Sequence, residues 1–598
     1  MFRINYSKLG LEEVKAAVLA GGGPVSAGEL SDWLVGREIC VQLDNESVEP
    51  PVLKYSFQSK DKLTLTENDN APVECAYGAL QLKDYILFAH MVPETLRGYT
   101  VILDACTGRA IVTEMWFIDY QGAEIDKSQP LAPAEISNMD FFINREVERQ
   151  VYIGCFTEAD RPATDKRVYH SLRLDNKVIK WDDDLGRKRI FTYISNYFST
   201  MVELDTPDGE DVITFPCDYL QFDDRTFFYD VGEVEYAGRL SVEVIDLFTM
   251  KKIGVTMGID EDDRFEFRLY RAEGRQLGQL ATFFDFSDWG ETLPVSLANR
   301  LKNGKKGSRL TYRTSLLARE QTEEEINALA GSVKEFERGE SHAATTSASM
   351  EFSTQCLGKK VVFRDDSGFF TELDFIEQEK LRFRTADHDW AEANYRAFAL
   401  DEDLVYLGFH IKDSCPPQAM TFALDFVNGC ATCIVATIGG GAEPHDVVPE
   451  YHFGYMETEG VPVPRTRRHG FTRELVGRSF TWTYSKEMSS QHIYSAPESY
   501  SWTIFIGGTP GEPGYRAGGF AWSSPCTYIK LRDNVYILNW VEEKWSGSFS
   551  SAAMNLRIMH DGGFVLGCAH DGSGLMFGML GAYARDAGRF DMSGIYTI

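Results

Sequence analysis

The second half of this chain repeats the first in an ordered series of matching segments. The pentapeptides at 216–220 (PCDYL) and 525–529 (PCTYI) stand 309 residues apart, and Asp246 meets Asn555 at that same offset. Three further pairs precede them in the same order: 85–90 with 405–410, 103–104 with 424–425, and 152–154 with 452–454. Single matches arise by chance, whereas an ordered series over roughly 250 residues indicates a duplicated unit.

A weaker repeat divides each half into two modules. The four modules open with a glycine or asparagine followed by a basic residue, at Gly36-Arg37, Asn176-Lys177, Gly358-Lys359 and Gly477-Arg478. Glycine and asparagine tolerate the left-handed backbone that a tight strand entry requires. Each half is therefore expected to hold two related domains of about 110–130 residues, within the usual size range.

Strand patterns dominate inside each module. Residues 242–246 (VEVID), 480–484 (FTWTY) and 500–504 (YSWTI) alternate at period two, and Asp561-Gly562-Gly563 is one of several expected turns. Helical patterns are confined to 11–20 and to 323–338, which follows a capping box at Thr322. We predict an all-β fold of four antiparallel β-barrels, arranged as two duplicated two-barrel units with few helices, because closing a barrel removes exposed strand edges.

The predicted domain boundaries follow the modules. They are an N-terminal helical segment at 1–30, barrel 1 at 31–150, barrel 2 at 151–300, a helical and polar linker at 301–350, barrel 3 at 351–460, and barrel 4 at 461–598. The linker is assigned from the polar stretch 302–347, which is rich in Lys, Gly, Glu, Ser and Thr.

Acidic residues outnumber basic ones by 90 to 60, which gives a formal net charge of −30. Nucleic acid and anionic membranes both require a cationic surface, so we expect neither as a partner. The 11 cysteines show no framework spacing, and neither a signal peptide nor an apolar run of about 18 residues is present. These features predict a cytoplasmic protein. We expect a monomer or a homodimer, since a duplication can replace a homodimer with an internal pseudo-dimer.

Three segments near the C-terminus carry a resemblance to a known family. Residues 477–484 (GRSFTWTY), 490–495 (SQHIYS) and 499–502 (SYSW), supported by 536–543 (YILNWVEE), resemble the MoaF family, named molybdenum cofactor biosynthesis protein F. The resemblance covers 350–598, and 31–290 is similar to a second, more diverged copy without the QHIY and YSW segments. The modules are also similar to lipocalin-like (calycin) barrels, including phenolic acid decarboxylases, which implies enzymes that use tyrosines, an arginine and a glutamate without a cofactor.

The last module holds the densest set of polar and aromatic side chains. We predict that Tyr494, Tyr500, His492 and Glu542 are catalytic, and that Tyr484, Trp502, Trp540, Asn555, His410, Tyr395 and Trp390 bind substrate. Tyrosine, histidine and glutamate are the usual agents of proton transfer. Alternation is taken to place Tyr484 on the strand face of Phe480 and Trp482 on the opposite face, and Tyr500 and Trp502 on one shared face. The alternative is that inward aromatics form an ordinary barrel core with satisfied hydroxyls.

His90 and His410 fall at matching places in the first and third modules, where a structural hydrogen bond is favoured over catalysis. A second possible pocket surrounds His410, with Trp390, Asn394, Tyr395 and Asp425. Cys430 and Cys433 form a C-x-x-C in a strand-like run with no second pair, so a zinc or redox site is disfavoured. No metal and no cofactor are predicted.

Three functions remain open. The first is a cofactor-independent enzyme that acts on a small aromatic or apolar organic molecule inside a β-barrel, through acid–base chemistry of the lyase, isomerase or cyclase type, as in secondary metabolism. The second is a lipocalin-like protein that binds a small molecule without catalysis. The third is a scaffold for protein contacts. Ionisable groups facing one cavity would favour the enzyme, and interiors filled by large side chains would favour the scaffold.

Overall fold

The fold is described by a computed structural model of the 598-residue chain. The described residues are 11–44, 51–119, 145–169, 171–194, 198–206, 209–233, 239–260, 264–281, 334–335, 348, 350–412, 414–438, 447–485, 489–506, 520–542, 548–568 and 575–596. The chain divides into two compact units, one comprising Met1–Thr311 with Gly519–Trp522 and the other comprising Tyr312–Gly518 with Ser523–Ile598. Each unit contains two antiparallel β-barrels.

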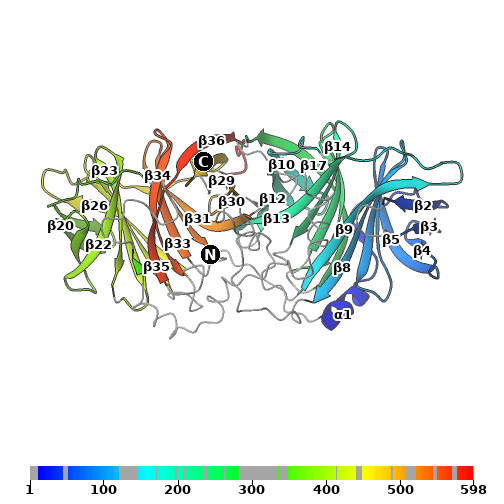
Figure 1. Cartoon of the computed structure of the whole chain (residues 1–598), viewed down its shortest axis with the longest axis horizontal. Coiled ribbons are helices and arrows are strands. Elements are labelled where there is room, and N and C mark those ends of the chain that lie inside the picture. Colours follow the sequence, from blue (N-terminus) through cyan, green and yellow to red (C-terminus); the bar gives the residue numbers. More distant parts are fainter. Residues whose placement is uncertain are drawn as a thin grey trace. The chain divides into compact units, whose positions relative to one another are not determined.

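The first unit begins with α1 (Leu11–Gly21), which confirms the helix predicted at 11–20, and continues into two barrels (Figure 1). Barrel 1 is closed and consists of β2 (Glu38–Leu43), β3 (Leu53–Phe57), β4 (Lys62–Glu67), β5 (Val73–Leu82), β6 (Tyr85–Met91), β7 (Arg97–Asp104), β8 (Arg109–Asp119) and β9 (Arg145–Thr157). Barrel 2 consists of β10 (Lys177–Asp183), β11 (Lys188–Tyr193), β12 (Phe198–Thr206), β13 (Gly209–Gln221), β14 (Thr226–Glu233), β15 (Arg239–Asp246), β16 (Lys251–Ile259) and β17 (Phe265–Gln279). The short strand β1 (Val25–Ser26) joins barrel 2 by pairing in parallel with β17.

The second unit repeats this plan. Barrel 3 is closed and consists of β19 (Lys360–Asp365), β20 (Phe370–Glu377), β21 (Lys380–Thr385), β22 (Ala391–Asp401), β23 (Leu404–Ile411), β24 (Gln418–Asp425), β25 (Cys430–Ile438) and β26 (Val447–Glu457). Barrel 4 consists of β28 (Arg478–Thr483), β29 (Ser489–Tyr494), β30 (Ser499–Ile506), β31 (Phe520–Arg532), β32 (Val535–Glu542), β33 (Ser548–Asn555), β34 (His560–Cys568), β35 (Leu575–Leu580) and β36 (Tyr583–Arg589). Two short strands extend it: β27 (Gly470–Phe471) pairs with β31, and β18 (Lys334–Glu335) pairs in parallel with β35.

The all-β prediction is therefore confirmed, with four antiparallel barrels and one helix among the described residues. The predicted helix at 323–338 is wrong at residues 334–335, because these form β18; the rest of that segment lies outside the described residues. Asp561-Gly562-Gly563 was taken for a turn but lies inside β34, since the turn comes before it, between β33 and β34.

Strand register repeats between the two units at the offset seen in the sequence. In barrel 2, Cys217 pairs with Val231 and Thr226 pairs with Asp246; in barrel 4, Cys526 pairs with Trp540 and Val535 pairs with Asn555, each residue shifted by 309. The short parallel strands β1 and β18 also occupy the same place in their units. This repeated order is what the predicted duplication requires.

Barrel 4 closes less completely than barrel 2. In barrel 2 the single strand β17 pairs with both β16 and β10 and so completes the ring. In barrel 4 the corresponding stretch is split into β35, which pairs with β34, and β36, which pairs with β28. Among the described residues, β34 and β36 are then joined by the single pair His560–Tyr583.

The matching of His90 with His410 is wrong. The strand-end pairs that set the alignment are Tyr85 with Asp104 in barrel 1 and Leu404 with Asp425 in barrel 3. His410 lies one residue further from this pair than His90 does, so the two side chains leave opposite faces of the sheet. His90 points into barrel 1, with Nε2 at 3.3 Å from Tyr55 Oη, whereas His410 points out of barrel 3, with Nδ1 at 2.9 Å from Glu335 Oε1.

Two apolar layers hold each unit together. One layer fills the closed barrel: the interiors of barrels 1 and 3 consist of fully buried aliphatic and aromatic side chains such as Phe88 and Phe422. The other layer lies between the two barrels of a unit, where outward side chains such as Phe398 and Phe564 of barrels 3 and 4 pack with ring centroids 5.3 Å apart. Strand alternation supplies both layers, since successive residues face opposite sides.

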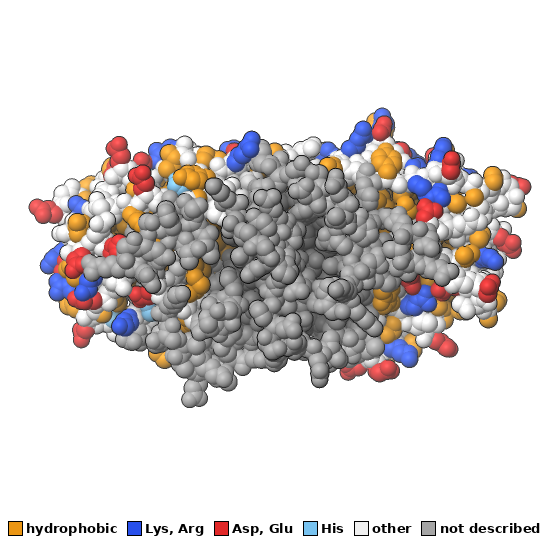
Figure 2. All heavy atoms as spheres, viewed as in Figure 1, with side chains coloured by type: hydrophobic (Ala, Val, Ile, Leu, Met, Phe, Trp, Pro, Cys, Tyr) orange, Lys and Arg blue, Asp and Glu red, His pale blue; other side chains and the backbone are white. Residues whose placement is uncertain are grey.

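Charges of both signs are interspersed among the described side chains of the surface seen in Figure 2. No helix in the described part of the chain has the length and apolarity needed to cross a membrane.

Substitution of Gly408 by valine is expected to destabilise the second unit by about 1–3 kcal/mol, because overpacking a close interface forces side chains off their rotamers. A Cβ at Gly408 would lie 2.7 Å from the ring of Phe564 in barrel 4. Urea unfolding of the full chain measures the effect. Gly470→Val is the control, since a Cβ there meets no atom within 4 Å, and an equal loss in both variants would contradict the packing argument.

Candidate functional site

The interior of barrel 4 is lined on one side by aromatic and polar side chains from five neighbouring strands. The inward residues of β28–β32 and of the segment after β28 are Phe480, Trp482, Tyr484, Ser490, His492, Tyr494, Tyr500, Trp502, Ser524, Tyr528 and Trp540. Their rings form a continuous set of contacts: centroids lie 5.1 Å apart for His492–Tyr500, 5.6 Å for Tyr494–Tyr528 and 6.1 Å for Tyr500–Trp540.

The opposite wall of barrel 4 combines serine, alanine and glycine with a few aliphatic side chains and one carboxyl group. The inward positions of β33–β35 alternate with the outward apolar residues that pack on barrel 3, and they are Ser548, Ser550, Ala552, Met554, Asp561, Gly563, Val565, Gly567, Met576, Gly578 and Leu580. Val565, Met576 and Leu580 are partly exposed although they face inward. The partial exposure of these three inward residues shows that this side of the interior meets solvent.

Four polar atoms of the interior have no hydrogen-bond partner among the described residues. They are Trp482 Nε1, Ser490 Oγ, His492 Nδ1 and Tyr494 Oη. All four residues are at most 6% exposed. Buried polar atoms are bonded in the great majority of cases, and each unbonded one costs about 1–3 kcal/mol. Four such atoms inside one barrel indicate a site that a ligand or ordered water completes.

Other polar groups of the same interior are satisfied by the protein. The indole N–H of Trp502 donates to Ser524 Oγ at 3.0 Å, and the Tyr528 hydroxyl donates to the Ser499 carbonyl at 3.3 Å. His492 Nε2 lies 3.4 Å from the Tyr484 hydroxyl, which leaves Nδ1 as its unpartnered nitrogen.

Burial sets the protonation states of this interior. Desolvation lowers the pKa of His492 to about 3, so the imidazole is neutral at physiological pH. Desolvation raises the pKa of the Tyr494 hydroxyl well above its ordinary value, with the Trp482 indole acting in the opposite direction. Desolvation also raises the pKa of Asp561 to about 8, although the backbone N–H of Ala582 donates to its carboxyl group. Asp561 is thus largely protonated at neutral pH.

The structure brings together six of the predicted residues. Tyr484, His492, Tyr494, Tyr500, Trp502 and Trp540 all line barrel 4, and Tyr500 and Trp502 share the inner face as predicted. Trp482 was assigned to the wrong face: it lies 6.1 Å from Phe480, centroid to centroid, on the inner face. Glu542 ends β32, and its side chain lies outside the described part of the structure.

Asn555 does not belong to this site. It is buried at the end of β33, where Nδ2 donates to the Leu400 carbonyl of barrel 3 at 2.7 Å and Oδ1 accepts the backbone N–H of Arg557 at 3.0 Å. Its role is to fix a turn and a contact between barrels 3 and 4.

The second pocket predicted around His410 does not form. His410 and Asn394 converge on Glu335 of β18, with Nδ1 and Nδ2 at 2.9 and 3.0 Å from the carboxylate oxygens. The other three predicted members point elsewhere. Tyr395 lies inside barrel 3, Trp390 is 47% exposed beside Arg382 and Arg384, and Asp425 binds Arg532.

Sequence reasoning missed Trp482, Ser490 and Asp561 as residues of the candidate site. Trp482 could have been found, because 480, 482 and 484 have the same parity along one strand. Asp561 was hidden by its context, since an Asp-Gly-Gly sequence is typical of a turn. Within the described residues, no three His, Cys, Asp or Glu side chains are grouped as the ligands of a metal ion would be.

Barrel 2 has the same strand plan but a filled interior. Trp181 and Tyr193 stand at the positions of Trp482 and Tyr494, and here the indole N–H donates to the tyrosine hydroxyl at 3.1 Å. Long charged side chains stand on the opposite wall. Lys252 Nζ lies 2.6 Å from Glu243 Oε1, and both residues are buried.

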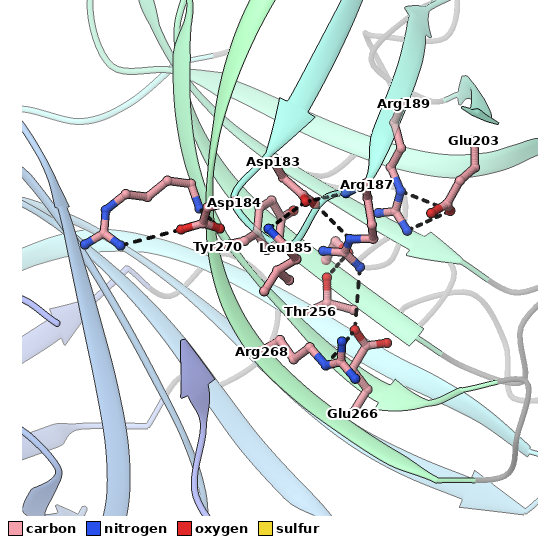
Figure 3. Close-up of polar contacts among 12 residues, drawn as sticks. Asp183, Asp184, Leu185, Arg187, Arg189, Glu203, Thr256, Glu266, Arg268 and Tyr270 are labelled. Carbon is pink, nitrogen blue, oxygen red and sulfur yellow. Dashed lines mark hydrogen bonds and ion pairs between the residues drawn. The ribbon is translucent and has the colours of Figure 1, made fainter. Parts of the chain in front are cut away.

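The charged side chains of barrel 2 neutralise one another at one end of the barrel. Figure 3 shows Arg187 between Asp183 and Glu266, at 2.8 and 3.5 Å, and Arg189 beside Glu203 at 2.9 Å. Four buried atoms of the barrel 2 interior, Tyr229 Oη, Glu243 Oε2, Arg187 Nη2 and Arg239 Nε, also have no hydrogen-bond partner among the described residues. Barrel 4 is the stronger candidate site because its unpartnered atoms lie among aromatic rings, and the facing wall carries serine, alanine and glycine where barrel 2 carries charged side chains.

Two family models match the second half of the chain. Residues 469–589 match the MoaF C-terminal domain. That match covers barrel 4, and residues 343–440 match the MoaF N-terminal domain, which covers most of barrel 3. The second half of the chain thus contains both MoaF domains in order. No curated protein matches the chain.

Proposed function

We propose that barrel 4 binds a small organic molecule inside its aromatic interior and that Tyr494 and Asp561 carry out acid–base chemistry on it. The observation that carries this proposal is the group of unpartnered, buried polar atoms on Trp482, Ser490, His492 and Tyr494. A fold that leaves these atoms without partners is stabilised by any ligand that supplies them.

Proton transfer is the chemistry that these groups supply. Asp561, with its pKa raised to about 8, can donate a proton near neutral pH and take it back, which suits a general acid. The flat rings of Tyr500, Trp502 and Trp540 would hold the substrate and exclude water. A lyase, isomerase or cyclase reaction on an aromatic or otherwise apolar molecule fits this set, without a cofactor, and secondary metabolism is where such substrates arise.

We also propose that residues 31–290 are a second, diverged MoaF-like copy produced by duplication. Support comes from the shared strand register at an offset of 309 residues and from the matching strands β1 and β18. In this copy the buried pair Lys252–Glu243 stands where barrel 4 has Asp561 and Ala552, so we assign binding to barrel 4 alone.

Filling the wall opposite the aromatic rings of barrel 4 tests the binding site. Gly578→Phe places a ring among inward residues, beside Met576 and Val565, and is expected to abolish retention of the bound molecule without unfolding the chain. Native mass spectrometry of the full-length protein, followed by denaturation and identification of the released compound, measures retention. Gly470→Phe, where a Cβ meets no atom within 4 Å, is the control. Equal retention in wild type and Gly578→Phe would contradict binding inside barrel 4.

The released compound then separates catalysis from binding. If the protein is an enzyme, wild type converts the compound or its precursor, and Tyr494→Phe lowers turnover more than it lowers affinity. If wild type returns the compound unchanged and only binds it, the carrier function replaces the enzymatic one. The filled interiors of barrels 1 and 3 favour a structural role for those two barrels.

A further inference from the structure

Each unpartnered atom of barrel 4 belongs to a side chain that can donate a hydrogen bond. The Trp482 indole nitrogen only donates, and the hydroxyls of Ser490 and Tyr494 each carry one proton to donate. The Trp482 indole cannot accept, and the acceptor it faces in the protein, the Tyr494 hydroxyl, lies outside hydrogen-bond geometry, so an acceptor placed between them by a ligand or by water would satisfy both groups.

Protein acceptors near these donors are already in use. Ser524 Oγ accepts from the Trp502 indole, and the Ser499 carbonyl accepts from the Tyr528 hydroxyl. In barrel 2 the equivalent indole is satisfied within the protein, because Trp181 donates to Tyr193. In barrel 4 the Trp482 indole also faces the Tyr494 hydroxyl and acts to lower its pKa, but the two atoms do not reach hydrogen-bond geometry.

Asp561 adds to this donor set. It faces into the barrel from β34, is 4% exposed, and interacts electrostatically with Tyr494. One carboxyl oxygen already accepts the Ala582 N–H. A protonated carboxyl group presents an O–H to whatever occupies the interior.

We propose that the ligand of barrel 4 is a flat compound with a carbonyl oxygen that accepts hydrogen bonds from Tyr494 and Trp482. This inference rests on the proposed binding function and names its ligand class. The aromatic wall of Tyr500, Trp502 and Trp540 selects the flat part of the molecule, and the donors select the oxygen. A hydrocarbon of equal shape would leave the same donors unpartnered on binding, and this lowers its affinity.

The test compares two probes that differ only at the acceptor. 2-Acetonaphthone carries a carbonyl oxygen where 2-isopropenylnaphthalene carries a methylene group, and the rest of each molecule is alike. Equilibrium dialysis against the full-length protein is expected to show that the ketone binds at least about tenfold more tightly. The carbonyl stretching frequency of the bound ketone is expected to fall, which reports the hydrogen bond directly. Acetophenone and α-methylstyrene repeat the comparison with one ring.

Variants assign the preference to named donors. Tyr494→Phe keeps the ring and removes the hydroxyl, and it is expected to reduce the preference for the ketone by about threefold or more; Tyr494→Phe with Trp482→Phe is expected to remove it. Tyr528→Phe is the matched control, because that hydroxyl already donates to Ser499 and its loss should leave the preference unchanged.

Each outcome separates the two proposals. Equal binding of ketone and hydrocarbon, or a preference that survives in the double variant, overturns the carbonyl inference while leaving a binding site in place. Failure of all four probes to bind overturns the binding function itself. A preference that is lost equally in Tyr528→Phe overturns the assignment to Tyr494 and Trp482.

Discussion

Replacement of Arg532 by methionine is expected to lower the free energy of unfolding of the second unit by about 3–5 kcal/mol at pH 7, because it leaves a buried carboxylate unpaired. Arg532 of β31 donates to both oxygens of Asp425 in barrel 3, from Nε at 3.0 Å and from Nη2 at 2.7 Å. Its Nη1 donates to Asp403 at 2.7 Å. Asp425 is 1% exposed, so water cannot replace the lost donors. Methionine keeps most of the apolar stem of arginine, so the decrease in the free energy of unfolding measures the contribution of the guanidinium group.

The effect of Arg532→Met should depend on pH with a definite sign. Burial acts to raise the pKa of Asp425, but the hydrogen bonds from Arg532 and Asn428 outweigh it and hold the pKa at about 2. The folded state therefore binds its proton less readily than the unfolded state. The stabilisation is complete above about pH 4 and is lost as the pH falls toward 2. Urea unfolding at pH 7 and at pH 3 is expected to show a smaller difference between wild type and variant at the lower pH.

Lys530→Met provides the control on the same strand. Lys530 pairs with Glu474 at 2.7 Å and with Asp533 at 3.0 Å, but these pairs are exposed to solvent. Exposed ion pairs contribute about 0–1 kcal/mol, so the control should change little. A cost below about 1 kcal/mol for Arg532→Met at pH 7, similar to that of the control, would contradict the role assigned to the buried pair.

Asp561→Asn is expected to stabilise the protein at alkaline pH by about 3–5 kcal/mol, an order-of-magnitude figure that follows from the pKa difference. Burial raises the pKa of Asp561 to about 8 in the folded state, against an ordinary value of 3.8. As the pH rises from about 4 to 8, the unfolded chain gives up this proton while the folded chain keeps it. Stability of the wild type therefore falls through this window and levels off above it. Asparagine has no proton to lose, so the variant lacks this decline.

The measurement is the difference in urea midpoint between wild type and Asp561→Asn at pH 4, 6, 8 and 9. The difference should be near zero at pH 4 and should grow up to pH 8. Asp586→Asn is a suitable control, because that carboxylate is exposed at the end of barrel 4. A difference that does not vary with pH would mean that Asp561 is ionised in the folded protein, and this would also remove it as the proposed acid.

Most of the fold could be predicted from local patterns. Alternation in segments such as 242–246 and 500–504 marks strands because successive side chains face opposite sides of a strand, and this signal needs no knowledge of the partner strand. The offset of 309 residues between the two halves is also kept in the strand pairing, because a shift of one residue would turn every inward side chain to the other face. Six residues of the candidate site follow from the same alternation.

The wrong predictions concern residues whose side-chain direction depends on the strand register. His90 and His410 are similar in sequence context, but a shift of one residue relative to the strand-end pairs turns His410 out of its barrel and toward Glu335. Asp561 stands in a sequence typical of a turn, yet it faces the inside of barrel 4 because the preceding turn is complete before β34 begins. Asn555 was predicted to bind substrate, but its side chain forms a hydrogen bond between barrels 3 and 4.

The sequence by itself determined that this chain consists of repeated β modules with aromatic inner faces. Strand periodicity can be read from each segment alone, and the duplication from comparing segments of the sequence with one another. Only the tertiary structure decided which barrels are filled and which polar atoms remain unpartnered. Barrels 2 and 4 share a strand plan, but Lys252 and Glu243 fill one interior while Asp561 and Ala552 stand at the same positions in the other. That difference depends on side chains that meet inside a barrel from strands far apart in sequence. No local sequence pattern shows which of these side chains will face each other.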